Sequence, residues 1–122
     1  MKYVIMFTST PEHDAAVSPE VAQDVYARVY QWFQDNADSI EDSGAELQPG
    51  DAATTVRHGA TGAVVVDGPF TEAREAVGGF TLIDVADLDA AIALARTWPM
   101  LELEGTSVEI RPIVTDYSQF EQ

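Results

Sequence analysis

Two segments with helical periodicity, separated by a run of short strand-like segments, restrict this chain of 122 residues to a small number of folds. The first helical segment follows Ser18 and the second follows Asp87, and strand-like runs precede, separate and follow them. One domain suits this length, and the order β, α, several β, α, β is typical of a ferredoxin-like or split β-α-β unit. We therefore predict an α+β fold with an antiparallel sheet and two helices on one of its faces.

The strand predictions rest on short runs that are rich in β-branched and aromatic residues and bounded by turn residues. The third and fourth of these runs flank a five-residue loop with two glycines, which predicts a hairpin. Residues 8–17 are predicted to form a loop, and residues 71–76 one or two helical turns. The predicted strands cover residues 2–7, 45–47, 54–57, 63–66, 79–85 and 106–112.

Each predicted helix begins at a capping residue. Ser18 can accept a hydrogen bond from the first turn and Pro19 suits the first helical position, while Asp87 is the predicted cap of the second helix. Gly44 is the predicted end of the first helix and Pro99 that of the second. The apolar face of the first helix, which we interpret as core together with Trp98, comprises Val25, Val29, Trp32, Phe33, Asn36 and Ile40.

The face of the sheet opposite the helices also needs cover, because several of its strand residues are too apolar to face water. Pairing two sheets face to face across a two-fold axis would bury them, so we predict a homodimer. The domain is predicted to span residues 1–114, followed by a tail at 115–122 that could dock on the body or on a partner subunit. The apolar residues that require cover are Val4, Met6, Val56, Phe80 and Leu82.

The chain is strongly acidic, with 21 acidic and 6 basic residues and a net charge of −15. Such a field repels phosphate backbones and anionic membranes, so we expect no nucleic-acid partner and no membrane partner. The short apolar start lacks the length of a signal peptide, which predicts a cytoplasmic protein. The acidity itself fits high solubility, a salt-rich host or a basic partner protein.

The segment Val66-Asp67-Gly68-Pro69-Phe70-Thr71-Glu72-Ala73-Arg74-Glu75 resembles the signature of the DGPF subgroup of the YCII-related family. Further segments resemble, in the same order, other strands and a helix of that family, so the resemblance spans residues 2 to about 114. These segments are residues 47–49, 53–57, 78–85, 87–91 and 108–112. The resemblance implies a dimeric α+β barrel of ferredoxin-like subunits. It also implies that relatives are often encoded near extracytoplasmic sigma factors.

Some relatives in this family carry a histidine on the first helix and an aspartate after the second, proposed as an acid–base pair. This chain departs from that pattern, because it has Tyr30 and Gln31 at the first place and Thr97-Trp98-Pro99 at the second. The pair is therefore not carried over to this chain. The dehydrohalogenase-like or hydrolase-like activity that goes with it loses its support.

The break at Asp67-Gly68-Pro69 carries the main candidate site residues. Asp67 ends a strand beside a glycine that admits close backbone approach, so it could act as a general base, or it could hold the turn. Gly68 and Pro69 fix the path of the chain. Phe70 is either a core residue or the apolar wall of a pocket.

Three further charged residues surround this break. Glu72 and Glu75 could divide acid and base roles, or could be surface acids. Arg57 lies on the neighbouring strand, where it could bind a substrate carboxylate or neutralise Asp67 or Glu72. The chain has no cysteine, and its two histidines show no metal-binding spacing, so we expect no metal and no cofactor.

Two hypotheses for function follow. The first is a small-molecule enzyme or ligand-binding protein, with Asp67 and Glu72 as catalytic candidates. Its predicted ligand-binding residues are Arg57, Asp67, Gly68, Pro69, Phe70 and Glu72. The alternative is a non-enzymatic accessory or regulatory protein that acts through its acidic surface, linked to extracytoplasmic sigma-factor systems.

Overall fold

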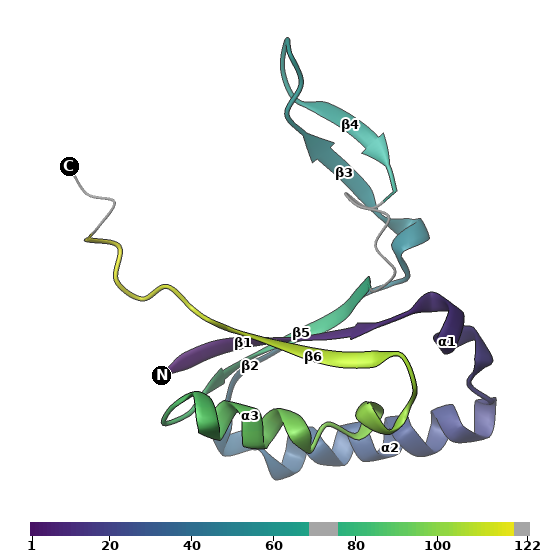
Figure 1. The fold of residues 1–122 in the computed structure, drawn as a ribbon, viewed down its shortest axis with the longest axis vertical. Coiled ribbons are helices and arrows are strands. Elements are labelled where there is room, and N and C mark those ends of the chain that lie inside the picture. Colours follow the sequence, from purple (N-terminus) through teal and green to yellow (C-terminus); the bar gives the residue numbers. More distant parts are fainter. Residues whose placement is uncertain (69–75, 119–122) are drawn as a thin grey trace.

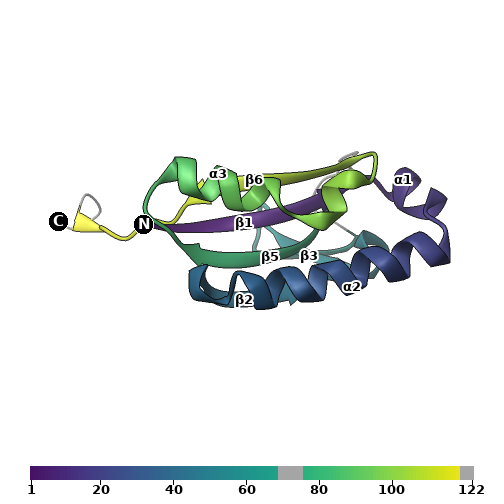
Figure 2. The same cartoon turned by 90° about the horizontal axis from the view of Figure 1, so that it is seen from below.

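The fold is a four-stranded antiparallel sheet in the order β2-β5-β1-β6, with the two long helices across one face (Figures 1 and 2). This computed structural model describes residues 1–68 and 76–118. The predicted α+β class and the placement of both helices on one face are confirmed. In chain order the elements are β1 (Lys2–Ser9), α1 (Pro11–Ala16), α2 (Pro19–Asp35), η1 (Ala37–Ser39), β2 (Ile40–Glu46), η2 (Gly50–Ala52), β3 (Thr54–Arg57), β4 (Val64–Asp67), β5 (Ala76–Asp84), α3 (Leu88–Arg96), η3 (Pro99–Glu102) and β6 (Thr106–Pro112).

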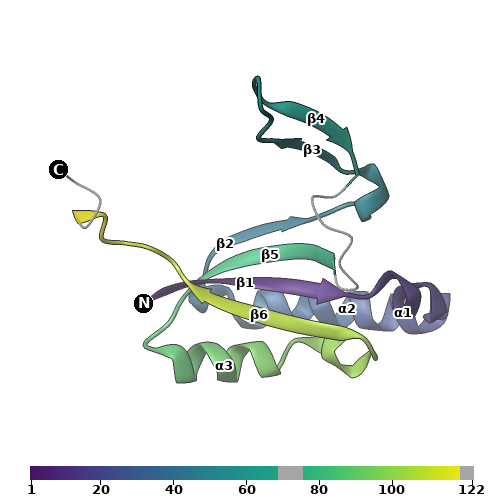
Figure 3. The same ribbon diagram turned by 45° about the horizontal axis from the view of Figure 1, so that its top comes forward.

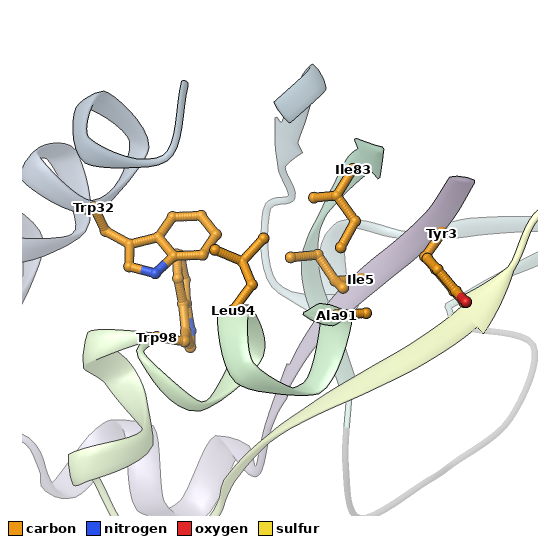
Figure 4. Packing of buried hydrophobic residues seen from close by; sticks show 7 residues of the cluster. All are labelled: Tyr3, Ile5, Trp32, Ile83, Ala91, Leu94 and Trp98. Atoms are coloured by element: carbon orange, nitrogen blue, oxygen red, sulfur yellow. The ribbon is translucent and has the colours of Figure 1, made fainter. Parts of the chain in front are cut away.

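The core lies between the sheet and the helices. Strand β1 is central and pairs antiparallel with both β5 and β6. Because side chains alternate along a strand, Tyr3 and Ile5 point toward the helices together with Ile83 of β5. The buried cluster, shown in Figure 4, comprises Tyr3, Ile5, Trp32, Ile83, Ala91, Leu94 and Trp98.

An aromatic group anchors one end of this core. Trp98 stacks on Phe7, with ring centroids 3.8 Å apart, and meets Trp32 edge to face at 5.0 Å. The Trp32 indole N–H donates a hydrogen bond to the Thr97 hydroxyl at 2.8 Å, which satisfies the buried polar atom. Trp32 is 5 % exposed and Trp98 7 % exposed, so the interpretation of both as core residues is confirmed.

The predicted helix caps are confirmed. The Ser18 hydroxyl accepts a hydrogen bond from the Val21 N–H at 3.3 Å, and the Asp87 carboxylate accepts one from the Ala90 N–H at 2.9 Å. Helix α3 ends at Arg96, three residues before Pro99, with Thr97 at its C-cap. No helix in residues 1–68 and 76–118 is long and apolar enough to cross a membrane.

The prediction that the first helix extends to Gly44 is wrong. Helix α2 ends at Asp35, where the side-chain amide of Asn36 donates to the Trp32 carbonyl at 2.8 Å and terminates the helix. Ile40 then begins β2 and pairs with Ile83 of β5. Gly44 therefore lies within a strand and not at a helix end.

The prediction of a loop over residues 8–17 is also wrong. Strand β1 continues to Ser9, and the short helix α1 follows, with Pro11 in its first turn. Proline suits that position because the missing N–H has no partner within the helix. The segment is thus ordered at the end of the central strand.

Strands β3 and β4 form a separate two-stranded sheet, which we call the arm (residues 54–67). The predicted hairpin is confirmed, but Val56 belongs to the arm and does not lie on the four-stranded sheet. The other four residues predicted to need cover are half-buried and face away from the helices, and we call them the open face. Figure 3 shows the helices on one side of the sheet and the arm on the other. The open face comprises Val4, Met6, Phe80 and Leu82.

Candidate functional site

The turn after β4 is held by Gly68 and Thr55. The Gly68 N–H donates to the Ala53 carbonyl at 2.8 Å, and the Gly68 carbonyl accepts a hydrogen bond from the Thr55 hydroxyl at 2.7 Å. Asp67 lies opposite Thr54, and its exposed carboxylate accepts no hydrogen bond from the part of the chain that the structure describes. The backbone and Thr55, rather than Asp67, supply the observed hydrogen bonds of this turn.

Arg57 lies away from Asp67. Asp67 pairs with Thr54, whereas Arg57 lies three residues further along β3 and pairs with Val64. Because side chains alternate along a strand, Arg57 and Asp67 point to opposite faces of the arm, and they are separated by roughly 10 Å along it. Within residues 1–68 and 76–118 the Arg57 guanidinium makes no ion pair. The expected neutralisation of Asp67 by Arg57 is thus not observed. Pro69, Phe70, Glu72 and Glu75 lie outside the described residues.

The chain returns from the DGPF segment to the sheet at Ala76, which pairs with Ser9 at the end of β1. Several polar side chains gather at this end of the sheet. They come from the end of β1 and the residue after it, from α1, from the turn before β6, and from the start of β6, which pairs with β1. We call them the β1-end cluster: Thr8, Ser9, Thr10, His13, Asp14, Glu104 and Ser107.

Hydrogen bonds connect the β1-end cluster in short chains. The Ser9 hydroxyl donates to the Asp14 carboxylate at 2.7 Å, and the hydroxyls of Thr8 and Ser107 bond to each other. The Thr10 hydroxyl bonds to Nδ1 of His13, whose Nε2 lies 3.7 Å from the Glu104 carboxylate. His13 is 40 % exposed, so a molecule in solution can reach its ring.

The Thr10 hydroxyl, the His13 imidazole and the Glu104 carboxylate lie in a row, and such an arrangement is suited to proton transfer. A histidine placed between a hydroxyl and a carboxylate has its ring oriented, and imidazole is the side chain most used for acid–base chemistry near neutral pH. Thr10 is also the N-cap residue of helix α1, although its side chain makes no capping hydrogen bond to the helix backbone. Gly105 allows this close arrangement, because a Cβ there would collide with both side chains.

The sequence reasoning missed this cluster because it assigned residues 8–17 to a loop and considered His13 only as a metal ligand. The signal that could have revealed it is Thr10-Pro11-Glu12-His13. A hydroxyl residue before proline, with a hydrogen-bonding residue three positions later, predicts a helix start directly after a strand. In the described residues, no group of three or more histidine, cysteine or acidic side chains could hold a metal ion.

A shallow groove on the helix side has a volume of about 420 Å³. Gln31 and Thr97 are among its lining residues, and Gln31 donates a hydrogen bond to Asp35 at 2.8 Å. Arg28 is already engaged, since it makes two hydrogen bonds of 2.8 Å with Glu102, which hold the pKa of that carboxyl below its usual value. The groove is lined by Arg28, Gln31, Trp32, Asp35, Asn36, Thr97 and Pro99.

Comparison with known proteins supplies one family match. The profile of the YCII-related domain matches residues 1–115. An uncharacterized protein of Rhizobium meliloti (strain 1021) is 45 % identical over 69 residues, which covers 57 % of this chain and 56 % of that protein. The chain thus matches about half of the length of that relative.

Similarity to solved structures includes the following example. It is the 5-chloro-2-hydroxyhydroquinone dehydrochlorinase of Burkholderia phenoliruptrix AC1100, in complex with 2,5-dihydroxybenzoquinone. The sequence identity is 18 % and the TM-score 0.46, with 89 % of this chain and 91 % of that chain covered. A similarity of this degree transfers no activity to the present chain.

Proposed function

This chain belongs to the YCII-related family, and we propose that it is a small-molecule-binding protein or enzyme of the DGPF subgroup, with its ligand site where residues 69–75 join the arm to the sheet. The observation that carries the proposal is the β1-end cluster beside Ala76. Polar groups that converge at the ends of strands in a sheet are typical of ligand sites.

His13 is the residue to which we assign proton exchange. Its ring is oriented by Thr10 on one side and faces Glu104 on the other, while its exposure leaves it open to a ligand. Serine and threonine hydroxyls at the same end can donate to or accept from oxygen atoms of a small polar molecule. Asp67 and Glu72 of the DGPF segment are further catalytic candidates, since that segment leads into the same strand.

The proposal includes a cytoplasmic homodimer. Its support is the open face, where Val4 and Met6 pair with Leu82 and Phe80 as adjacent apolar residues of β1 and β5. Stacking two such faces across a two-fold axis would remove them from water. It would also enclose the region beside the β1-end cluster, since Thr8 follows Met6 on the same side of β1.

The test is a thermal-shift screen of the wild-type protein against a library of small polar metabolites, including hydroxy and keto acids. A ligand that binds only the folded state raises Tm, by an amount that grows with its concentration. We expect His13→Asn to abolish the shift produced by the best hits. His58→Asn is the matched control, because His58 lies in the loop of the arm, and it should retain the shift.

The contrary results are distinct. Equal shifts in both histidine variants would place the site elsewhere. An absence of any shift across the library, together with salt-sensitive binding of a basic protein, would replace the proposal by an accessory role of the acidic surface.

A further inference from the structure

We infer that the β3–β4 arm is a docking element that clasps a second copy of this chain. The inference rests on the proposed homodimer and adds to it a second contact, separate from the stacking of the open faces. Three observations on the arm lead to it: its exposed valines, its lack of sheet partners, and its charge.

The arm exposes apolar side chains on both of its faces. Val56 and Val65 are directly opposite each other on one face and are 65 % and 69 % exposed. On the other face Val64 and Val66 are 40 % and 38 % exposed. Adjacent valines on an exposed hairpin are typical of a surface that is covered by another chain.

Within residues 1–68 and 76–118 no other strand supports the arm, because β3 and β4 pair only with each other. A two-stranded hairpin alone is marginally stable in water and needs a further surface against which to pack. The helices cannot supply that surface, since they lie on the opposite side of the sheet (Figure 3).

The charge of the arm selects the kind of partner. The arm, residues 54–67, contains Arg57 and one acidic residue, Asp67 at the end of β4, so 20 of the 21 acids lie elsewhere in the chain. Arg57 makes no ion pair with any residue that the structure describes. The arm therefore carries no net negative charge on a molecule of net charge −15, and its guanidinium can pair with an acidic side chain of another copy.

The position of the arm suits such a clasp. Figures 1 and 3 show that the arm and the open face lie on the same side of the sheet. A copy stacked on the open face would therefore come within reach of the arm. The edge strand β2 of that copy exposes Asp42, whose carboxylate can receive a guanidinium. Two-fold symmetry would use both arms equally.

Sedimentation equilibrium of the full chain tests the inference. The double variant Val56→Thr/Val65→Thr keeps side-chain shape but makes the arm polar, and we expect the dimer Kd to rise by about tenfold or more. Val21→Thr on α2, where the valine is 43 % exposed, is the matched control and should leave the Kd unchanged. Arg57→Glu should also raise the Kd, whereas Arg96→Glu on α3 should not raise it to the same extent.

Hydrogen exchange of the wild-type protein gives a second measurement that needs no variant. Amides of Val64–Asp67 should exchange faster when the protein is diluted below its dimer Kd, while amides of α2 should keep their protection. A dimer whose Kd is unaffected by the arm variants, or arm protection independent of concentration, would overturn the inference. So would a chain that stays monomeric at millimolar concentration.

The failure of this inference can be told apart from a failure of the proposed function. The arm is judged by the Kd and by exchange rates, whereas the ligand site is judged by the thermal shift and its loss in His13→Asn. A ligand that still stabilises the double variant would support the site while the arm is assessed independently.

Discussion

Thr55 and Asp67 are close in the fold but play different physical roles at the base of the arm. Thr55 donates the hydrogen bond that holds the Gly68 carbonyl, whereas the Asp67 carboxylate accepts none from the described residues. We therefore expect Asp67→Asn to leave Tm unchanged or to raise it. Thr55→Val removes one hydrogen bond, which costs about 1 kcal/mol, so its Tm should fall by about 4 °C in a calorimetric scan.

The reverse result has an equally definite meaning. A loss of several degrees in Asp67→Asn would show that the carboxylate holds the turn, and the DGPF motif would then be mainly a folding device. An unchanged or higher Tm means that the charge brings no stability, as is usual for a carboxylate retained for function.

Predictions for single residues were correct where the interaction involves only residues that are close in sequence. The caps at Ser18 and Asp87 were predictable because a capping side chain bonds to a backbone N–H only a few residues away. The distance and orientation of Arg57 relative to Asp67 could not be predicted from the sequence, because they depend on the pairing register of β3 and β4. An offset of three residues places the two side chains on opposite faces of the arm.

At the scale of elements, Gly44 marks the irregular pairing of β2 with β5. Its φ is +74°, and a Cβ there would collide with the backbone carbonyl of Phe80. Gly44→Ala should therefore lower the free energy of unfolding by about 2 kcal/mol or more, measured by urea denaturation. Gly62→Ala is the matched control: its φ is also positive, +136°, but no atom lies within 4 Å of the added methyl group.

The comparison separates steric collision from backbone strain. Gly62→Ala carries only the conformational penalty of a positive φ, so its cost should be about 1 kcal/mol. Equal costs at the two positions would mean that β2 shifts to accommodate the methyl group, and that the edge strand is less rigid than its pairing suggests.

The same strand explains why the first helix was predicted to be too long. Ile40 continues the helical spacing of Trp32 and Asn36, so periodicity alone cannot distinguish a further turn from the start of a strand. The decisive interaction is long-range, because Ile40 pairs with Ile83, which is fully buried. The hairpin and the last strand were predicted correctly because local turn residues and strict alternation define them.

The whole molecule combines strong self-repulsion with uncovered apolar surface. Each copy carries a net charge of −15, which opposes association, whereas the open face and the valines of the arm favour it. The open face was predictable in outline from apolar residues on alternate strand positions. The arm was not, because the sequence does not reveal that β3 and β4 leave the main sheet.

The balance between these forces predicts how the proposed dimer responds to salt. Screening extends over about 10 Å at 0.1 M ionic strength and about 3 Å at 1 M, so added sodium chloride weakens the repulsion between copies and should lower the dimer Kd. Sedimentation equilibrium across this range measures the effect. The Val56→Thr/Val65→Thr variant should have a higher dimer Kd than wild type at every salt concentration, because the contacts that it loses are apolar and are not screened by salt.

Arg57→Glu should behave differently from the valine variant in the same series. The increase in its dimer Kd relative to wild type should be largest at low salt and should shrink as salt rises. Screening weakens both the attraction that the variant has lost and the repulsion that it has gained. Increases in Kd that are constant with salt in both variants would mean that the arm binds without any contribution from charge. A wild-type Kd that rises with salt would mean that specific ion pairs across the interface outweigh the net repulsion of two chains that each carry −15.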